Sequence, residues 1–502
     1  MPRRPTIRRK KNQYIIQMES DHGSSGELMN AIDSASAERN DGPLMKQAAV
    51  SKGAVLFVTA TASFLTPFMS SSINIALPSI GSEFSSGAYS LSWISTAYLL
   101  AAAVFLVPVG RLADIHGRKK IFLSGMVGYT IVSLLCGLAT SATMLIALRA
   151  MQGAADALMF ATATALVTSV YPPSERGRAI GVNVASVYGG LALGPFIGGF
   201  ITQYLGWRSI FFVTTGMGLL VIALTIWKMR AEWAEAAGQK MDVIGSLLYA
   251  FTLLAVMNGF RLLPGLAGLA LIIAGAICLG TFVLRENSAT NPVLDMGLFR
   301  RNRVFALSNL SALINYAATF ALIFLLSLYL QYIKGMDPRT AGLVLLSQPI
   351  IMAVFSPLAG RLSDRVEPRV VASIGMSISA AGLLLTSFLD AGSTVARIVI
   401  LLMTCGLGFA LFSSPNTSAI MGSVERRQYG VASATTGAMR LIGQMLSMAI
   451  SGMIIALFVG KGQITPQAHA AFLGGFRVAF LLFAGLCAAG IFASMARGRL
   501  HK

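Results

Sequence analysis

The stretch from Gly110 to Lys120 has the sequence GRLADIHGRKK and lies between two long apolar runs. It concentrates charge in a chain of which only 12% is Asp, Glu, Lys or Arg. Charged side chains are costly in hydrocarbon, so this stretch must lie at a membrane face while the runs beside it cross the bilayer. We therefore predict a tight loop at residues 110–120 that joins two membrane-spanning helices.

The composition supports a membrane protein with many spans. At 502 residues and 55% hydrophobic, the chain is too apolar for a soluble protein of this size. A spanning helix needs about 20 apolar residues, and fourteen runs come close to that length. The predicted spans are residues 53–75, 91–109, 121–139, 142–170, 178–203, 209–227, 243–260, 265–284, 304–332, 341–359, 369–389, 394–421, 428–459 and 472–495.

The basic residues predict the orientation in the membrane. A net charge of +19 could indicate nucleic-acid binding, but the basic residues lie at the ends of predicted helices and in a short tail, so we expect none. With the N-terminus inside, the short inner loops hold roughly three times as many Lys and Arg as the outer ones. We predict the plasma membrane, the inner membrane of a bacterium, with both termini cytoplasmic. Residues 1–50 are polar and are expected to form a disordered cytoplasmic tail.

The chain shows no pattern of an enzyme or a metal site. The four cysteines lie singly inside apolar runs and the four histidines lie in tails or loops. There is no phosphate-binding loop and no nucleophile with a base. We therefore predict no cofactor, no metal and no enzymatic activity, and energy that comes from an ion gradient.

A weaker copy of the opening motif, Gly360 to Arg365 with the sequence GRLSDR, follows about 250 residues later, as in duplicated transporters. Both copies resemble the signature between the second and third helices of major facilitator transporters. The resemblance, in detail to the fourteen-span drug:proton antiporters, implies an all-α polytopic membrane protein with the major facilitator fold. We divide it into a tail (1–50), a six-helix half (51–228), a two-helix insertion (229–303) and a second six-helix half (304–502). The insertion should lie outside the transport pathway.

In the resembling family, the charged loop acts as a latch that holds one conformation. The positions that match are Gly110, Asp114, Gly117, Arg118 and, in the second copy, Asp364. An acid at such a loop can also face the positive N-terminal end of a neighbouring helix. The alternative is a simple anchor of basic residues at the cytoplasmic lipid surface.

A glycine-rich motif lies in the fifth predicted span. Gly190, Gly194 and Gly198 repeat every four residues and clear one helix face for close contact, and Pro195 should kink the helix there. Together with Gly199, the string resembles the antiporter signature of drug-exporting facilitators. It favours export over uptake.

Two charged residues lie deep in the fourth predicted span. Arg149 matches an arginine that the family implicates in proton transfer, and Asp156 follows it by seven residues on nearly the same helix face. An acid inside the membrane is by default a functional group, so both residues are proton-coupling candidates. The alternative is an ion pair of Asp156 with Arg149 or Arg440 that only stabilises packing. In helix 1, Met69 replaces the aspartate usual in the family, which puts cationic drugs in doubt as substrates.

Five further residues are candidates for lining the pathway, either because they match family motifs or because they are polar and deep. They are Asn74, Tyr98, Gln331, Asn416 and Arg440. For the four uncharged residues, a role in contacts between helices is an equally good explanation.

The resemblance implies a secondary active transporter that works by alternating access. We predict proton-coupled export of a hydrophobic or amphiphilic small molecule, of the multidrug efflux type, by a monomer in the lipid bilayer. One alternative is a facilitator that imports a small metabolite. Another is a membrane sensor or scaffold without transport, which would require a structured soluble domain that the chain lacks.

Overall fold

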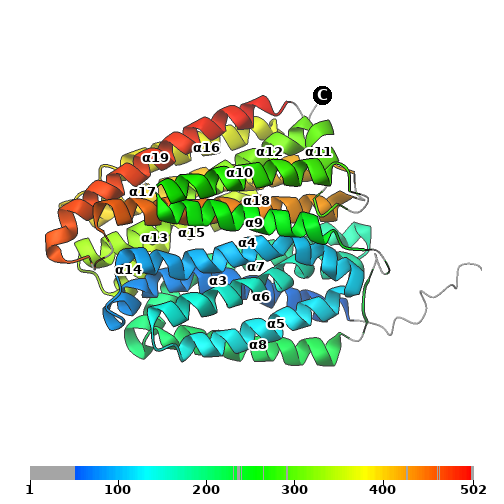
Figure 1. Ribbon diagram of the computed structural model, residues 1–502, viewed down its shortest axis with the longest axis horizontal. Helices are drawn as coiled ribbons and strands as arrows, with labels where there is room; N and C mark the ends of the chain where they lie inside the picture. The colour runs from blue at the N-terminus through cyan, green and yellow to red at the C-terminus, as the bar shows by residue number, and fades with distance from the viewer. Residues whose placement is uncertain are drawn as a thin grey trace, which may run out of the picture. The chain divides into compact units, whose positions relative to one another are not determined.

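The computed structural model describes residues 51–229, 231–234, 238, 240–263, 265–289, 292–294, 296–363, 365–425, 428–460, 462 and 464–498. The predicted tail of residues 1–50 and the latch candidate Asp364 lie outside them. From Ser51 onward the chain forms one compact unit of helices that run side by side (Figure 1).

Fourteen helical spans are long and apolar enough to cross a membrane, which confirms the predicted number in the described part of the chain. The first six are α3 (Lys52–Glu83), α4 (Ala88–His116), α5 (Arg118–Gly137), α6 (Ala142–Val170), α7 (Pro173–Leu205) and α8 (Arg208–Lys228). They are followed by α9 (Val243–Leu262), α10 (Leu266–Glu286) and the short α11 (Met296–Arg301). The last spans comprise α12 (Arg303–Thr319), α13 (Ala321–Leu328), η2 (Tyr329–Ile333), α14 (Pro338–Leu345), α15 (Ser347–Ser363), α16 (Pro368–Thr386), α17 (Val395–Gly422), α18 (Tyr429–Phe458) and α19 (His469–Ala496).

The predicted loop at 110–120 is shorter in the structure. Helix α4 continues through Asp114 to His116, and α5 begins at Arg118, so the turn consists of Gly117 alone. Its φ of 110° is a left-handed conformation that glycine adopts without steric cost. The charged residues therefore lie on the last turn of one helix and the first turn of the next, where their side chains can still reach the membrane surface.

Two predicted spans are broken helices. The ninth comprises α12, α13 and η2, and at its first break the Ala321 amide donates to the Ser447 hydroxyl of α18 at 3.0 Å. The tenth changes from α14 to α15 next to Pro349, whose ring removes a backbone donor from the helix. Hydrogen bonds from neighbouring groups make such breaks tolerable inside a membrane protein.

Helices α9 and α10 pack on the outside of the bundle. Helices α9 and α10 contact each other, and α9 also contacts α4 and α18 (Figure 1). The Tyr249 hydroxyl donates to the Ala103 carbonyl of α4 at 3.0 Å. At the start of α9, burial by itself raises the pKa of Asp242, but hydrogen bonds from the Gly245 amide and from Arg285 outweigh it and hold that pKa below its usual value.

The bundle has two ends, which we name by their turns: the basic end holds Gly117 and the opposite end holds Gly206. Near the opposite end, the helices before residue 230 bond directly to those after residue 300. Ser327 donates to the Asn74 carbonyl at 2.8 Å, and Arg339 donates to the Tyr204 hydroxyl at 3.0 Å. These contacts close the gap between the two sets of helices there.

Candidate functional site

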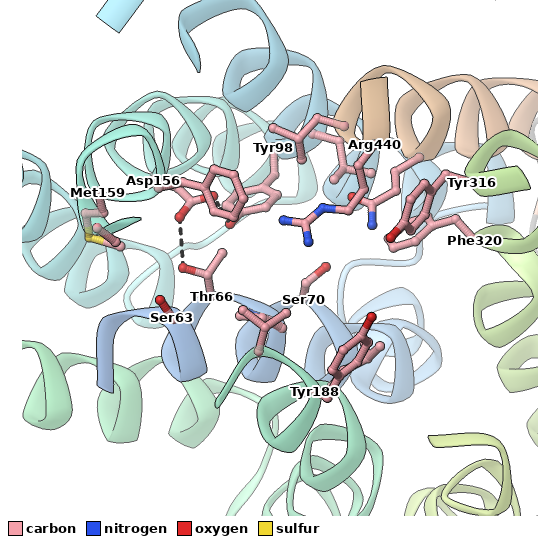
Figure 2. Close-up of a pocket in the computed structure, with 18 of the residues that line it drawn as sticks. Ser63, Thr66, Ser70, Tyr98, Asp156, Met159, Tyr188, Tyr316, Phe320 and Arg440 are labelled. Atoms are coloured by element: carbon pink, nitrogen blue, oxygen red, sulfur yellow. Dashed lines mark hydrogen bonds between the residues drawn. The ribbon is translucent and has the colours of Figure 1, made fainter. Parts of the chain in front are cut away.

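A cavity lies between the two sets of helices in the middle of the bundle (Figure 2). It has two adjoining lobes that share Ser70, Leu191, Tyr316, Phe320, Phe409 and Gln444. The lobe toward the basic end also contains Asp156 and Arg440, and the lobe toward the opposite end contains Asn74. Neither lobe is lined by a described residue of α9 or α10.

Asp156 of α6 is the centre of a three-helix junction. One carboxylate oxygen accepts from Thr66 of α3 at 2.8 Å, and the other accepts from Tyr98 of α4 at 2.8 Å. The residue is 3% exposed. Charge-assisted hydrogen bonds of this kind offset the cost of burying a carboxylate.

Arg149 is completely buried seven residues away on α6 and is held by different groups. Its guanidinium donates to the Gln152 side chain and to the Ile94 carbonyl, the latter at 3.2 Å, and lies 4.1 Å from the centre of the Tyr98 ring. Tyr98 therefore links the two charged residues, with its ring toward Arg149 and its hydroxyl toward Asp156. Among the described residues, Asp156 forms no ion pair with Arg149 or Arg440. The alternative of an ion pair that only stabilises packing therefore has no direct contact to support it.

In α3, Met69 stands at the position where the resembling family usually has an aspartate. Met69 is 1% exposed, and its sulfur accepts from Thr214 of α8 at 3.6 Å, on the side away from the cavity. Ser70 and Asn74 line the cavity instead. The carboxylate that this cavity has is therefore provided by α6 and not by α3.

The glycine motif of α7 presents two faces. A Cβ on Gly194 would lie 2.9 Å from the Phe68 carbonyl oxygen, and one on Gly198 would lie 2.6 Å from Ser72, so this face needs glycine to pack on α3. Gly199 faces the other way, toward the Pro338 carbonyl at the start of α14. Gly190 packs on α3 as well, and Pro195 lies against Gly342 of α14.

Some of the predicted latch residues contact one another. Arg118 pairs with Asp114 at 2.9 Å and donates to Ser169 of α6 at 2.7 Å, whereas no atom would approach a Cβ on Gly110 within 4 Å. Asp114 thus pairs with the side chain of the first residue of α5. The backbone amides of Lys119 and Lys120 at the start of α5 donate to the carboxylate of Glu232 at 2.8 and 3.1 Å.

Two pathway candidates lie away from the cavity. The Gln331 amide donates to the Ile75 carbonyl at 3.0 Å, among the contacts that close the opposite end. Asn416 donates to the Ser308 carbonyl at 3.1 Å and accepts from the buried Arg497 at 2.6 Å. The structure therefore gives both residues roles in packing, whereas Asn74, Tyr98 and Arg440 line the cavity.

Several lining residues were not predicted. Thr66 is one helical turn before Ser70, so the polar positions 66, 70 and 74 already indicate one face of α3. Tyr188 and Tyr316 offered no such signal, because single aromatic residues in an apolar span are common. Among the described residues, no group of three His, Cys, Asp or Glu side chains could hold a metal ion.

Comparison with known proteins identifies the family. A family model described as Major Facilitator Superfamily matches residues 59–307 and 308–500. The multidrug resistance protein Stp of Mycobacterium tuberculosis (strain ATCC 25618 / H37Rv) is 33% identical over 77% of this chain and 73% of its own. The tetracenomycin C resistance and export protein of Streptomyces glaucescens is 30% identical over 81% and 76%. The riboflavin transporter RibZ of Clostridioides difficile (strain 630) is 29% identical over 88% and 96%.

A solved structure has the same fold. It is a bacterial homolog of the human lysosomal transporter Spinster, in an inward-facing and unoccupied conformation. It is 18% identical to this chain, with a TM-score of 0.64 over 89% of this chain and 97% of its own.

Proposed function

The chain belongs to the Major Facilitator Superfamily and is an integral membrane transporter, and we propose that it exports hydrophobic or amphiphilic compounds in exchange for protons. Relatives named for multidrug resistance and for tetracenomycin C export support this direction. The observation that carries the proposal is the carboxylate of Asp156 in the wall of a central cavity that is otherwise lined mainly by apolar and aromatic side chains.

Asp156 is the proposed proton carrier, because a proton changes its hydrogen bonds. The ionised carboxylate accepts from both Thr66 and Tyr98. Once protonated, the carboxyl group becomes a donor itself, and one of these two hydroxyls has to turn and accept. Proton binding therefore rearranges a contact among α3, α4 and α6, which are all walls of the cavity. Arg149 is proposed to position Tyr98 within this junction.

Alternating access requires the cavity to open at one end at a time. We propose that the structure is the state closed at the opposite end, through the bonds of Ser327 and Arg339 across the two sets of helices. The close packing of Gly199 against α14 belongs to the same closure. The Asp114–Arg118 pair at the Gly117 turn, together with Gly110, is the proposed latch at the other end.

We place the basic end at the cytoplasm of a plasma membrane, in accordance with the excess of Lys and Arg there. We also propose that the chain acts as a monomer and is divided as the sequence indicates, into halves at 51–228 and 304–502 around the insertion at 229–303. The family assignment favours transport over a sensor or scaffold.

The test uses purified protein in liposomes that contain a pH-sensitive dye. Lipophilic compounds are added outside to the wild type, to Asp156→Asn and to Asp390→Asn. Asp390 is a matched control, because it is an exposed acid at the opposite end, bonded to Ser393. We expect compound-dependent proton movement in the wild type and in the control, and its loss in Asp156→Asn.

Proton movement that persists in Asp156→Asn would exclude Asp156 as the carrier. Absence of proton movement with every compound would contradict proton antiport. Each variant is first compared with the wild type by gel filtration and thermal unfolding, so that loss of folding is not mistaken for loss of coupling.

Import of a small metabolite is the second candidate, because RibZ, a riboflavin transporter, matches over most of both chains. The same liposomes distinguish the two. Uptake coupled to protons moves compound and proton in one direction, whereas antiport moves them in opposite directions.

A further inference from the structure

Arg440 of α18 is a cation in the cavity that has no partner among the described residues. No hydrogen bond or ion pair from the part of the chain that the structure describes reaches its guanidinium, and its buried Nε lacks an acceptor there. Its nearest aromatic contact is Phe160, whose ring centre lies 4.8 Å from the guanidinium carbon. Figure 2 shows the group in the open space between Asp156 and Tyr316.

Asp156 does not neutralise this cation directly. Both of its oxygens accept from hydroxyls, and the residue is 3% exposed, so its oxygens offer little surface for direct contact with a molecule in the cavity. Arg149 lies against the Tyr98 ring, on the side of the cavity that holds Asp156, and adds a second positive charge. Two guanidiniums around one carboxylate leave an excess of one positive charge. Because the walls of the cavity have a low dielectric constant, this charge acts strongly on a ligand.

Aromatic side chains from both sets of helices form another part of the wall. Tyr188 comes from α7, Tyr316 and Phe320 from the region of α12, and Phe409 from α17. The rings of Tyr316 and Phe409 meet edge to face, with centres 5.5 Å apart. Such walls favour flat apolar groups through contact area and ring stacking.

We propose that the substrates of this cavity are aromatic carboxylates, with the carboxylate bound by the guanidinium of Arg440 and the ring system held between the aromatic walls. This inference rests on the proposed transport through the cavity. A carboxylate matches the planar donor fork of arginine, whereas a lipophilic cation would face an uncompensated positive charge.

The test measures binding to the full-length protein in detergent micelles, without any gradient. The probes are anthracene-2-carboxylate, anthracene-2-carboxamide and 2-(aminomethyl)anthracene, which share one ring system and are anionic, neutral and cationic. Fluorescence anisotropy gives a dissociation constant for each. We expect the carboxylate to bind the wild type at least about tenfold more tightly than either other probe.

Substitution of the arginine shows whether the preference originates there. Arg440→Gln should weaken carboxylate binding about tenfold or more and remove the preference, and Arg440→Lys should retain the preference with weaker binding. Arg397→Gln is the control, because Arg397 is exposed near the start of α17, at the opposite end of the bundle from the latch. It should bind all three probes as the wild type does.

Tighter binding of the cation, equal binding of all three probes, or no binding of the carboxylate would overturn the proposal. So would an unchanged preference in Arg440→Gln. If Arg440→Gln does not fold, Arg440→Lys and the wild-type preference still decide the question. The result is separable from that of proton exchange, because binding is measured without a gradient and proton movement is measured with Asp156→Asn.

Discussion

The two charged sides of the cavity differ in how completely their polar groups are bonded. On the side of α3, α4 and α6, Thr66, Tyr98, Arg149 and Asp156 bond to one another or to neighbouring groups, although the buried Nη2 of Arg149 has no hydrogen-bond partner among the described residues. On the side of α12 and α18, the polar groups of Arg440, Tyr316 and Gln444 have no hydrogen bond among the described residues, although all three line the cavity.

The difference indicates that the two sides have different roles, one in holding helices together and the other in binding ligands. Buried polar groups are stable when they are bonded, and an intact network holds its helices in one arrangement. Polar groups that line a cavity without partners remain available to water or to a ligand. We therefore expect substitutions on the first side to reduce stability, and substitutions on the second side to change ligand binding with little effect on stability.

The largest contrast should be between the two arginines. Lysine cannot reproduce the planar donors that Arg149 directs at Gln152 and Ile94, so Arg149→Lys should lower the free energy of unfolding by about 1.5–3 kcal/mol. Arg440→Lys should change it by less than about 0.5 kcal/mol. Unfolding in mixed micelles by titration with dodecyl sulfate measures both. Equal losses would show that Arg440 is bonded as firmly as Arg149.

A smaller contrast is expected between two tyrosines. Tyr98→Phe removes the donor to one oxygen of Asp156 and should cost about 1–2 kcal/mol of unfolding free energy. Tyr316→Phe removes a hydroxyl without a bonded partner and should cost nearly nothing. The same titration applies to both variants. A stable Tyr98→Phe would mean that water replaces the hydroxyl, and the first side would then be less closed than the structure shows.

The smallest contrast concerns two uncharged side chains. Thr66→Val keeps the shape and removes the other donor to Asp156, which should cost about 1 kcal/mol because this residue is only partly buried. Gln444→Met keeps the length of a side chain that bonds to no described residue, and it should leave stability unchanged while altering the affinity for anthracene-2-carboxylate. If Gln444→Met destabilised the protein more than Thr66→Val, the assignment of the two sides would be reversed.

The spans and the tight helix packing could be predicted because they depend on local pattern. Runs of apolar residues near the length of the bilayer indicate each helix, and glycines at 190, 194 and 198 indicate one helix face. The broken helices were not predicted, since the break before Ala321 is stabilised by Ser447, 126 residues away along the chain. The local sequence pattern does not indicate a partner so far away along the chain.

The roles of the charged residues were only partly predictable for the same reason. Asp156, Arg149 and Arg440 were singled out because charge deep in a span is costly wherever it lies. Which of them would pair was open. Among the described residues Asp156 forms no ion pair with either arginine, and Tyr98 lies between Arg149 and Asp156. Likewise, the sequence did not indicate that Glu232, more than 110 residues away along the chain, accepts from the backbone amides at the start of α5.

By itself, the sequence determined that this chain is a helical membrane protein with fourteen spans, a duplicated motif and buried charges. These properties follow from the cost of exposing polar groups to hydrocarbon, which acts on every residue regardless of its distant neighbours. Only the tertiary structure decided which polar groups are bonded and which face the cavity, because hydrogen bonds depend on distances of about 3 Å between helices far apart in the chain. That distinction separates the enclosed Asp156 from the open Arg440.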